Sequence, residues 1–447
     1  MNIFAYPKEK ANRLALTGVL LLVFWTTINL LFTRVWSIFP GVVGYLGEAL
    51  LVALLGYVLF HPELGRKHIW TKLKNPINFA FLLFIAFAFV SMFLNNVPFA
   101  QGIFGLRALF QFVLLVIILL MLEIPTAWVK KLFYLIIGMA FVQSVVGIFQ
   151  VILGIPLPLH NMEERRSVAI GEEIRAFGFM DSSNTLAGFL LVAVLLIVLY
   201  LFMYRAEVPK KHKVILLSML AVMLLALTLT FSRQAFLALI GCLGLIGLLF
   251  RHNKTFRIML ITSVSLGVLF VIGYGLALLF LEGFAQRNFY TFDFERNYRV
   301  LMALAGLQVF MFSPVIGVGP GMFGSNAAFV FDSPFHQFMY DMLPVLMTTV
   351  DNNALAVFVE YGIIGTVLFL FLFWSIFRWM FKLSDSVNPA VRWLSVFVIT
   401  YGIAFLLMGL LSTAWENHPL SIFFWLFLGI VLNWHQNNKH LTKEESV

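Results

Sequence analysis

Charged residues are scarce in this sequence, and cysteine is nearly absent. Only 11% of the 447 residues are Asp, Glu, Lys or Arg, whereas hydrophobic residues make up 61%. A water-soluble protein of this size needs about 25% charged residues to keep its surface wet, so a soluble fold is excluded. The one cysteine, Cys242, lies in an apolar run, which excludes a disulfide framework and a cysteine-ligated metal cluster.

Metal-ligand spacings are also missing. No pair of His or acidic residues has the spacing of a metal site, so we expect neither a metal nor another cofactor. The excess of 30 Lys and Arg over 21 Asp and Glu gives a net charge of +9. In a soluble protein this excess would suggest nucleic acid as a partner, but here the basic residues lie in short gaps between apolar runs. We therefore expect membrane lipids, and no nucleic acid, as partners.

Long apolar runs fill the sequence instead, and Phe alone supplies 50 residues. A helix of about 20 apolar residues crosses a hydrocarbon core of ~30 Å, and about twelve such runs occur. The first run lacks a small-residue cleavage site, so we expect no cleavable signal peptide. The predicted fold is an all-α polytopic membrane protein with a single integral-membrane domain over residues 1–447. The expected spans are 14–33, 41–60, 77–94, 103–122, 132–154, 185–204, 214–231, 235–250, 257–281, 352–376, 392–411 and 418–434.

Most Lys and Arg residues are concentrated in alternate gaps between these spans. Because cytoplasmic loops carry an excess of Lys and Arg, this alternation predicts that both termini are cytoplasmic. Two outer segments, 155–184 and 282–351, are longer than the rest, and the second is an extracytoplasmic loop between spans nine and ten. The inner gaps are short, so we expect the chemistry on the outer face. The break at 232–233 fits either a tight hairpin or a kink in one long helix.

Arg233 is the first candidate for chemistry, because arginine in a membrane protein is costly unless it is paired or faces water. It stands between two apolar runs with almost no loop, in LTFSRQAF, which places its guanidinium at the outer membrane boundary. A planar fork there can bind a phosphate or pyrophosphate bidentately. The alternative is that Arg233 reaches up to ordinary lipid phosphates, and the residues alone favour neither interpretation.

Arg299 is the second candidate. The apolar residues after it recur with helical spacing, which predicts an amphipathic helix on the membrane surface that is stopped by Pro314. Arg296 and Arg299 share a face if this helix begins early, and with Arg287 they could form a basic cradle. The alternative is that these arginines pair with the acidic residues beside them in the chain.

Gly319, Gly321 and Gly324 spell G-x-G-x-x-G. The dinucleotide fingerprint of that form needs a preceding strand and an acidic residue about twenty positions later. Here the glycines follow a helical stretch, so we reject nucleotide binding. They predict a turn whose backbone comes close to a ligand or to another helix, which makes Gly319 a possible substrate contact.

Asp351 begins the tenth span. Asp is a favoured helix N-cap and complements the helix dipole, which is the structural alternative. Functionally, a carboxylate held at the membrane surface near arginines could accept a proton from a hydroxyl nucleophile. Glu360, further along the same helix, lies deeper and on the opposite side, and we interpret it as structural. His336 is a lone loop histidine, a type that is more often hydrogen-bonded than catalytic, and we keep it as a possible substrate contact.

Polar residues near the earlier spans have simpler interpretations. Asn184 opens the sixth span and is a good N-cap, besides being a possible substrate contact. The charged cluster before it, residues 163–175, is most simply a solvated loop, although such alternating charges often hold sugars. Glu48 and Arg107 are the buried charges of the early spans, and we expect an ion pair between them.

Taken together, these residues resemble the O-antigen ligase and Wzy-type polymerase superfamily of bacterial glycosyltransferases. Three patterns carry the resemblance: SRQ at 232–234, Arg299 ahead of SPVIGVGPGMFG, and DNNALAVFVEYGIIG at 351–365. The patterned region, 175–380, is interpreted as a ligase/polymerase-like core. Asp351 stands where the ligase branch usually has His, although Asn352 keeps its place. This departure favours the polymerase branch.

The resemblance implies a function for the outer face. Its substrates would be oligosaccharide repeat units linked to undecaprenyl pyrophosphate in the bacterial cytoplasmic membrane, joined into O-antigen, capsule or another surface polysaccharide. The implied reaction is metal-independent inverting glycosyl transfer. Arg233 and Arg299, with Arg296, would bind the donor pyrophosphate, Asp351 would orient or deprotonate the acceptor hydroxyl, and Asn352 would contact substrate. A chain-length regulator and a flippase of the same pathway are possible partners.

Two other functions remain open at this point. A ligase would join the glycan to a lipid or protein acceptor instead of to a second repeat unit. A transporter or flippase for lipid-linked glycans can also have about twelve spans, but it would need charges along a central path through the membrane. Here the charges gather at the outer boundary.

Overall fold

The protein is a bundle of helices. The computed structural model describes residues 8–35, 45–64, 74–155, 169–170, 173–204, 206–251, several positions between 254 and 272, 298–342, 350 and 352–444. Its elements are α1 (Lys8–Val35), α3 (Leu46–Phe60), α5 (Pro76–Leu94), α6 (Phe99–Phe110), α7 (Val113–Met121), α8 (Thr126–Leu153), β1 (Ala169–Ile170), β2 (Glu173–Ile174), α10 (Ser183–Met203), α11 (Lys210–Leu229), α12 (Arg233–Leu249), α15 (Tyr298–Phe310), α16 (Asn326–Val330), α17 (Pro334–Met342), α18 (Asn353–Leu383), α19 (Pro389–Gly409) and α20 (His418–Glu444). The strands β1 and β2 form one short antiparallel pair.

The all-α polytopic membrane fold predicted from the apolar runs is confirmed. Among the described residues, 8 helices are long and apolar enough to cross a membrane, and there are up to 9 if α6 and α7 form one span bent by 64°. Two expected spans are shorter helices, α3 and α12, and the expected span 257–281 lies mostly outside the described residues. The count of about twelve spans, estimated from the length needed to cross a bilayer, stays a prediction.

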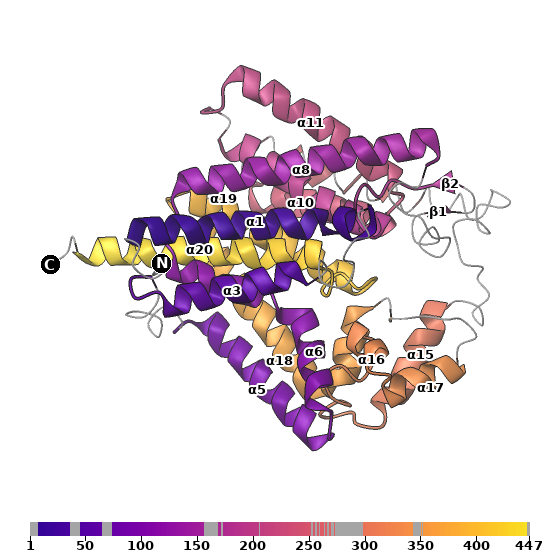
Figure 1. Ribbon diagram of the computed structural model, residues 1–447. Coiled ribbons are helices and arrows are strands. Elements are labelled where there is room, and N and C mark those ends of the chain that lie inside the picture. The colour runs from indigo at the N-terminus through magenta and orange to yellow at the C-terminus, as the bar shows by residue number, and fades with distance from the viewer. Residues whose placement is uncertain are drawn as a thin grey trace.

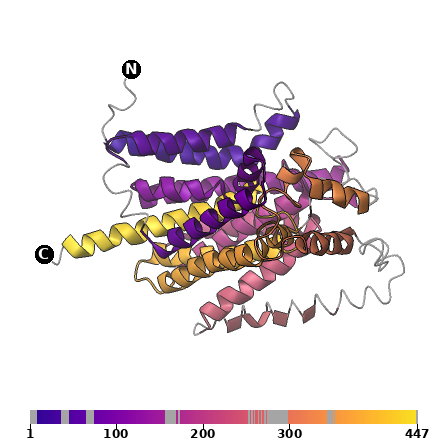
Figure 2. The same cartoon turned by 90° about the horizontal axis from the view of Figure 1, so that it is seen from below.

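Burial separates central helices from peripheral ones. In the most apolar 18-residue stretches of α20, α19 and α10, 83%, 78% and 72% of the residues are buried. In those of α5 and α11 the buried shares are 33% and 22%. A helix that is apolar all round is stable where it is covered all round, which matches α10 at the centre. Figure 1 shows α5 and α11 on opposite sides of the bundle, and Figure 2 shows the yellow helix α20 running into the bundle from the side of the C-terminus. The exposed apolar faces of α5 and α11 are suited to lipid.

Segments that were predicted to lie on the same face of the membrane are close together in the bundle. At the end predicted to be cytoplasmic, the α7–α8 connection contacts α1 and α20. Asn12 Nδ2 of α1 donates to the Glu123 carbonyl at 2.8 Å, and Trp434 Nε1 of α20 donates to the Ile124 carbonyl at 2.7 Å. At the other end, on the right of Figure 1, lie β1, β2 and α15–α17. These contacts are consistent with the predicted alternation of inner and outer connections, while the orientation in the membrane stays a prediction.

The predicted ion pair of the early spans is confirmed. Arg107 Nη1 of α6 pairs with Glu48 Oε2 of α3. The Arg107 guanidinium also lies 4.2 Å from the centre of the Phe104 ring, and His418 Nε2 at the start of α20 lies 4.0 Å from Glu48 Oε1. Together with His418, the pair thus joins three helices, α3, α6 and α20.

Candidate functional site

The α11–α12 turn presents Arg233 at the start of a helix. Helix α11 ends at Leu229 and α12 begins at Arg233, so a turn separates two helices and the possibility of a kink in one helix is excluded. Phe231 in this turn has φ 49°. Arg233 is exposed, and Ser232 before it is buried at the N-cap position. The first N–H groups of a helix and its dipole favour an anion, so this position suits a phosphate.

Arg175 comes to the same turn from the long segment before α10. Its Nε donates to the Thr230 carbonyl at 2.7 Å, and the Ala176 N–H donates to the Leu229 carbonyl at 2.9 Å. The interpretation of residues 163–175 as a solvated loop is therefore wrong for Arg175, whose half-buried side chain closes the last turn of α11. The carbonyl groups at a helix C-terminus attract a guanidinium, which explains this contact. Residues 163–168 lie outside the described residues.

The chain that follows Arg175 is fixed against α8. Gln150 Oε1 accepts from the Gly178 N–H at 2.8 Å while Gln150 Nε2 donates to the Gly178 carbonyl at 2.7 Å. Gln143 Oε1 accepts from the Phe179 N–H at 2.6 Å. Both glutamines are buried, so their amide groups satisfy backbone groups that would otherwise be stranded away from water. The segment that holds Arg175 is thus rigid.

The predicted N-cap of the sixth span, Asn184, lies two residues after the observed one, Ser182. Ser182 caps α10, because its Oγ accepts from the Thr185 N–H at 3.2 Å, and Asn184 lies half-buried in the first turn. Ser182 is the cap because it is the extended residue directly before the helix, from which its short side chain reaches the free N–H groups of the first turn. The Thr185 hydroxyl then accepts from Asn417 Nδ2 at 2.8 Å, which ties this helix start to the loop before α20.

The start of α18 is a second polar centre at this end. Asn352 is its N-cap and accepts from the Leu355 N–H at 2.9 Å, so the structural alternative for Asp351, that it caps this helix, is wrong. Asn353 is buried: its Oδ1 accepts from the Trp415 N–H and its Nδ2 donates to Glu416 Oε1, both at 2.8 Å. Asp351 itself lies outside the described residues, immediately before this cap.

Glu416 was missed by the sequence analysis. It lies in the short connection between α19 and α20, where its Oε2 also accepts from the Asn326 N–H of α16 at 3.4 Å. Burial raises the pKa of the Glu416 carboxyl to about 7, although the hydrogen bonds from Asn326 and Asn353 act in the opposite direction. The available signal was an acidic residue in a short gap of the predicted outer face. A single residue of that kind says little without its neighbours.

The loop arginines are only partly described. Arg299 is the second residue of α15, and its side chain lies outside the described part of the chain, as do Arg296 and Arg287 entirely. The helix predicted after Arg299 is confirmed, and it ends at Phe310, ahead of Pro314. It packs against α18, where Gly306 approaches Leu355. The backbone of Arg299 is therefore on the helix that lies along the start of α18.

The glycine turn approaches another helix, as predicted. Gly317, Gly319, Gly321 and Gly324 all have φ between 70° and 103°. The Gly319 N–H donates to the Glu360 carbonyl at 2.9 Å, and a side chain at Gly319 would collide with Val97. Gly319, which was predicted as a possible substrate contact, is therefore covered by α18 on one side and by Val97 on another.

Glu360 supports this turn, whereas His336 lies against α16. Glu360 Oε1 accepts from the Phe323 N–H at 3.0 Å and from Ser325 Oγ at 3.1 Å, which confirms its structural interpretation. His336 in α17 is 3% exposed and lies against Phe329. Burial lowers the pKa of His336, with Asp332 acting in the opposite direction. Its role as a substrate contact stays a prediction.

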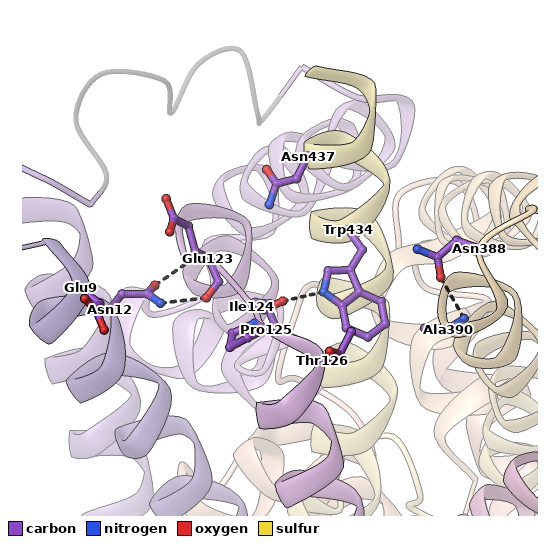
Figure 3. A pocket seen from close by; sticks show the side chains of 10 residues that line it. All are labelled: Glu9, Asn12, Glu123, Ile124, Pro125, Thr126, Asn388, Ala390, Trp434 and Asn437. Carbon is purple, nitrogen blue, oxygen red and sulfur yellow. Dashed lines mark hydrogen bonds between the residues drawn. The ribbon is translucent and has the colours of Figure 1, made fainter. Parts of the chain in front are cut away.

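A cavity lies where the α7–α8 connection meets the start of α1 and the end of α20 (Figure 3). It has a volume of about 480 Å³ and is lined by residues of the α1 start, the α7–α8 connection, the α19 start and the α20 end. Its lining residues are Glu9, Asn12, Glu123, Ile124, Pro125, Thr126, Asn388, Ala390, Trp434 and Asn437. The cavity contains none of the residues that the sequence analysis singled out.

Comparison with known proteins supports the resemblance seen in the sequence. Residues 218–370 match the family model described as O-antigen ligase. A search of curated proteins found no match. The matched region runs from α11 to the middle of α18 and includes Arg233, Arg299 and Asp351. Residues 218–370 of this polytopic membrane protein are therefore similar to the O-antigen ligase family, which supports the predicted superfamily without separating its polymerase branch from its ligase branch.

Proposed function

We propose that the protein is a polymerase that joins oligosaccharide repeat units carried on undecaprenyl pyrophosphate. The reaction would take place on the outer face of the bacterial cytoplasmic membrane and yield O-antigen, capsule or another surface polysaccharide. One observation carries the proposal: Arg233 starts the apolar helix α12, and Arg175 is bonded to the turn before it. Guanidinium groups and helix N–H groups together suit a diphosphate.

Positions of the other candidate residues support a single reaction centre. The segment 175–185 binds the α11–α12 turn at its beginning and, through Thr185, the loop of Asn417 at its end. The neighbouring residue in that loop, Glu416, is bonded to Asn353 at the start of α18. The chain thus links the turn of Arg233 to the helix that Asp351 precedes. The distance between Arg233 and Arg299 stays a prediction, as does the role of Arg296.

The proposed chemistry is an inverting transfer. The acceptor hydroxyl attacks the anomeric carbon of the donor sugar from the face opposite the phosphate, so a new carbon–oxygen bond forms as the bond to the phosphate breaks. The electron pair leaves on the lipid pyrophosphate, where Arg233 and Arg299 stabilise the developing charge. A carboxylate takes the hydroxyl proton. Asp351 would orient the hydroxyl or accept this proton, and Asn352, His336 and Asn184 would contact the sugars.

The Asp351 side chain favours the polymerase branch over the ligase branch. By the resemblance described above, the ligase branch usually has His at this position, so a different proton acceptor or positioning group would act here. A ligase is therefore the second candidate. A flippase or transporter is the third, and the grouping of Arg175, Glu416 and Arg233 toward one end of the bundle disfavours it because charges lining a central path are needed.

The function can be tested with lipid-linked repeat units as the only substrate. We expect the purified full-length protein in bilayer nanodiscs to convert them into a ladder of products that differ by one repeat unit, detected by gel electrophoresis. A single transfer to an added lipid or protein acceptor, without a ladder, would mean a ligase. Unchanged substrate in both assays, with transbilayer movement in vesicles, would mean a transporter.

Replacing Asp351 with asparagine tests its role in the same assay. If Asp351 orients or deprotonates the acceptor hydroxyl, Asp351→Asn lowers the elongation rate by about 10²-fold or more, the usual contribution of a general base or positioning carboxylate. Binding of donor should change little, since the proposed pyrophosphate contacts are elsewhere. Near-normal polymer synthesis by Asp351→Asn would remove Asp351 from the mechanism.

A further inference from the structure

Glu416 is held in place by two helices. Its Oε1 accepts from Asn353 Nδ2 at 2.8 Å at the start of α18, and its Oε2 accepts from the Asn326 N–H at 3.4 Å at the start of α16. Asn353 is itself fixed, because its Oδ1 accepts from the Trp415 N–H at 2.8 Å and it is 1% exposed. An amide that is locked at both ends fixes the direction of the carboxylate. Glu416 is thus held in a fixed orientation at Asn353, the residue that follows the N-cap Asn352.

The charge of Glu416 is not balanced by a described cation. Among the described residues Glu416 makes no ion pair, and its two donors are neutral groups. A carboxylate that only fastened the fold would be stabilised best by an arginine or lysine. Half-buried and without such a partner, the group holds its proton more tightly than an ordinary glutamate, so its pKa lies at about 7.

The surroundings of Glu416 contain few other titratable groups. Helix α18 contributes Glu360 and Tyr361, whose side chains both interact electrostatically with Glu416, and α20 contributes His418. Asp181 precedes α10, the helix that contacts this loop through Thr185. Helix α16 and the end of α19 carry no charged side chain. None of these groups is a cation that would hold Glu416 ionised at low pH, apart from a protonated His418.

We infer that Glu416 is the proton acceptor for the acceptor hydroxyl, and that Asn353 is its positioning residue. The inference rests on the proposed function and deepens it. In the transfer, the hydroxyl proton moves to Glu416 as the oxygen bonds to the anomeric carbon and the lipid pyrophosphate leaves with the electron pair. Water then removes the proton. Asp351 would in this case orient the hydroxyl instead of taking its proton.

A carboxylate of this kind suits the task better than Asp351. A general base is most effective when its pKa is near the working pH, because it is then ionised and still binds a proton well. An aspartate close to arginines keeps a low pKa and is a weak base. Glu416 lies in the connection between α19 and α20, outside residues 218–370, so the inference concerns a part of the chain that the family match does not cover.

The test compares Glu416→Gln with the unaltered protein in the ladder assay between about pH 5 and about pH 9. The rate of the unaltered protein should rise with pH through about 7. Glu416→Gln keeps the size and can still accept a hydrogen bond, so we expect a folded protein whose rate falls by about 10²-fold to 10⁴-fold and no longer rises in this range. In Asn353→Ala the rise should move to higher pH, since the Asn353 hydrogen bond lowers the pKa of Glu416.

A matched control lies at the other end of the bundle. Glu123→Gln removes an exposed carboxylate that pairs with Lys8, and we expect its rate and pH profile to equal those of the unaltered protein. Thermal unfolding gives a second measurement that needs no substrate. Because the folded state raises the pKa of Glu416 to about 7 from its ordinary value of 4.5, its contribution to stability is full below the lower value and is lost as pH rises through the higher one. Glu416→Gln should lack this loss.

Three results would overturn the inference. One is a near-normal rate in Glu416→Gln. Another is a rate that falls by the same factor at every pH and keeps the rise near 7, since that pattern means a structural clamp. The third is an unfolding profile in Glu416→Gln that keeps the same pH dependence. Absence of a ladder with the unaltered protein would overturn the proposed function, and the proton-acceptor role with it, so the two failures are distinguishable.

Discussion

Arg233→Ala should lower the elongation rate by about 10³-fold, which is the order of the effect when an arginine that stabilises a phosphate leaving group is removed. Arg233 is exposed at the first position of α12, where the helix N–H groups and the guanidinium can act on one phosphate. Alanine keeps the helix but removes the charged fork. The loss should fall mainly on the chemical step, because the charge on the leaving pyrophosphate is larger in the transition state than in the bound substrate.

Two further variants separate phosphate binding from a general effect of charge. Arg233→Lys keeps the charge without the bidentate fork, so we expect a partial loss, between those of the unaltered protein and Arg233→Ala. Arg251→Ala removes an exposed arginine just beyond the other end of the same helix, and its rate should be unchanged. Full-length polymer made by Arg233→Ala at a normal rate would exclude the phosphate clamp, and lipid anchoring of Arg233 would then be the better interpretation.

The apolar pattern predicts most of the fold, because a membrane span needs only length and hydrophobicity. The runs at 185–204 and 392–411 became α10 and α19 with boundaries within a few residues. The run at 103–122 instead gave two helices bent by 64° at Gln111 and Phe112. No Pro or Gly lies at that break, and the helices on either side are both apolar, so composition alone could not predict it.

The candidate site was harder to predict, because its contacts join distant parts of the chain. Arg233 could be found since an arginine at a membrane boundary needs a reason. Arg175 and Glu416 could not, because their partners Thr230 and Asn353 lie 55 and 63 residues away in the sequence. Either residue, read alone, resembles an ordinary charged loop residue. The glycine turn is the exception: its spacing predicted a close backbone approach, and the partner proved to be α18.

This close approach depends on a break in α18 at Gly362. Gly362 has φ 62° and ψ −166°, a backbone conformation that only glycine adopts readily. The break leaves backbone groups of α18 available to the glycine turn: the Ile363 N–H donates to the Pro314 carbonyl at 2.9 Å, and the Val359 carbonyl accepts from the Val318 N–H at 3.1 Å. Glu360, beside the break, holds the far end of the turn through Phe323. The turn and the helix break therefore require each other.

Gly362→Ala should destabilise the protein by about 3 kcal/mol or more, since strained backbone alone costs about 1–3 kcal/mol and a steric clash adds to it. A Cβ at this position would lie 2.6 Å from the Val315 carbonyl oxygen and would also collide with the Gly317 nitrogen. Both are backbone atoms that cannot rotate away, so the turn must separate from α18 and lose its hydrogen bonds. The measurement is the thermal unfolding midpoint of the purified protein, which should fall by several degrees.

Gly241→Ala is the matched control for this prediction. Gly241 lies within α12, and a Cβ there would meet no heavy atom within 4 Å. Alanine has the higher helix propensity by about 1 kcal/mol, so this variant should unfold at the same temperature or slightly higher. If Gly362→Ala unfolded at the same temperature as Gly241→Ala, the turn would not depend on the helix break. Because the turn lies between α15 and the start of α18, its separation should also reduce polymer synthesis, which Gly241→Ala should leave unchanged.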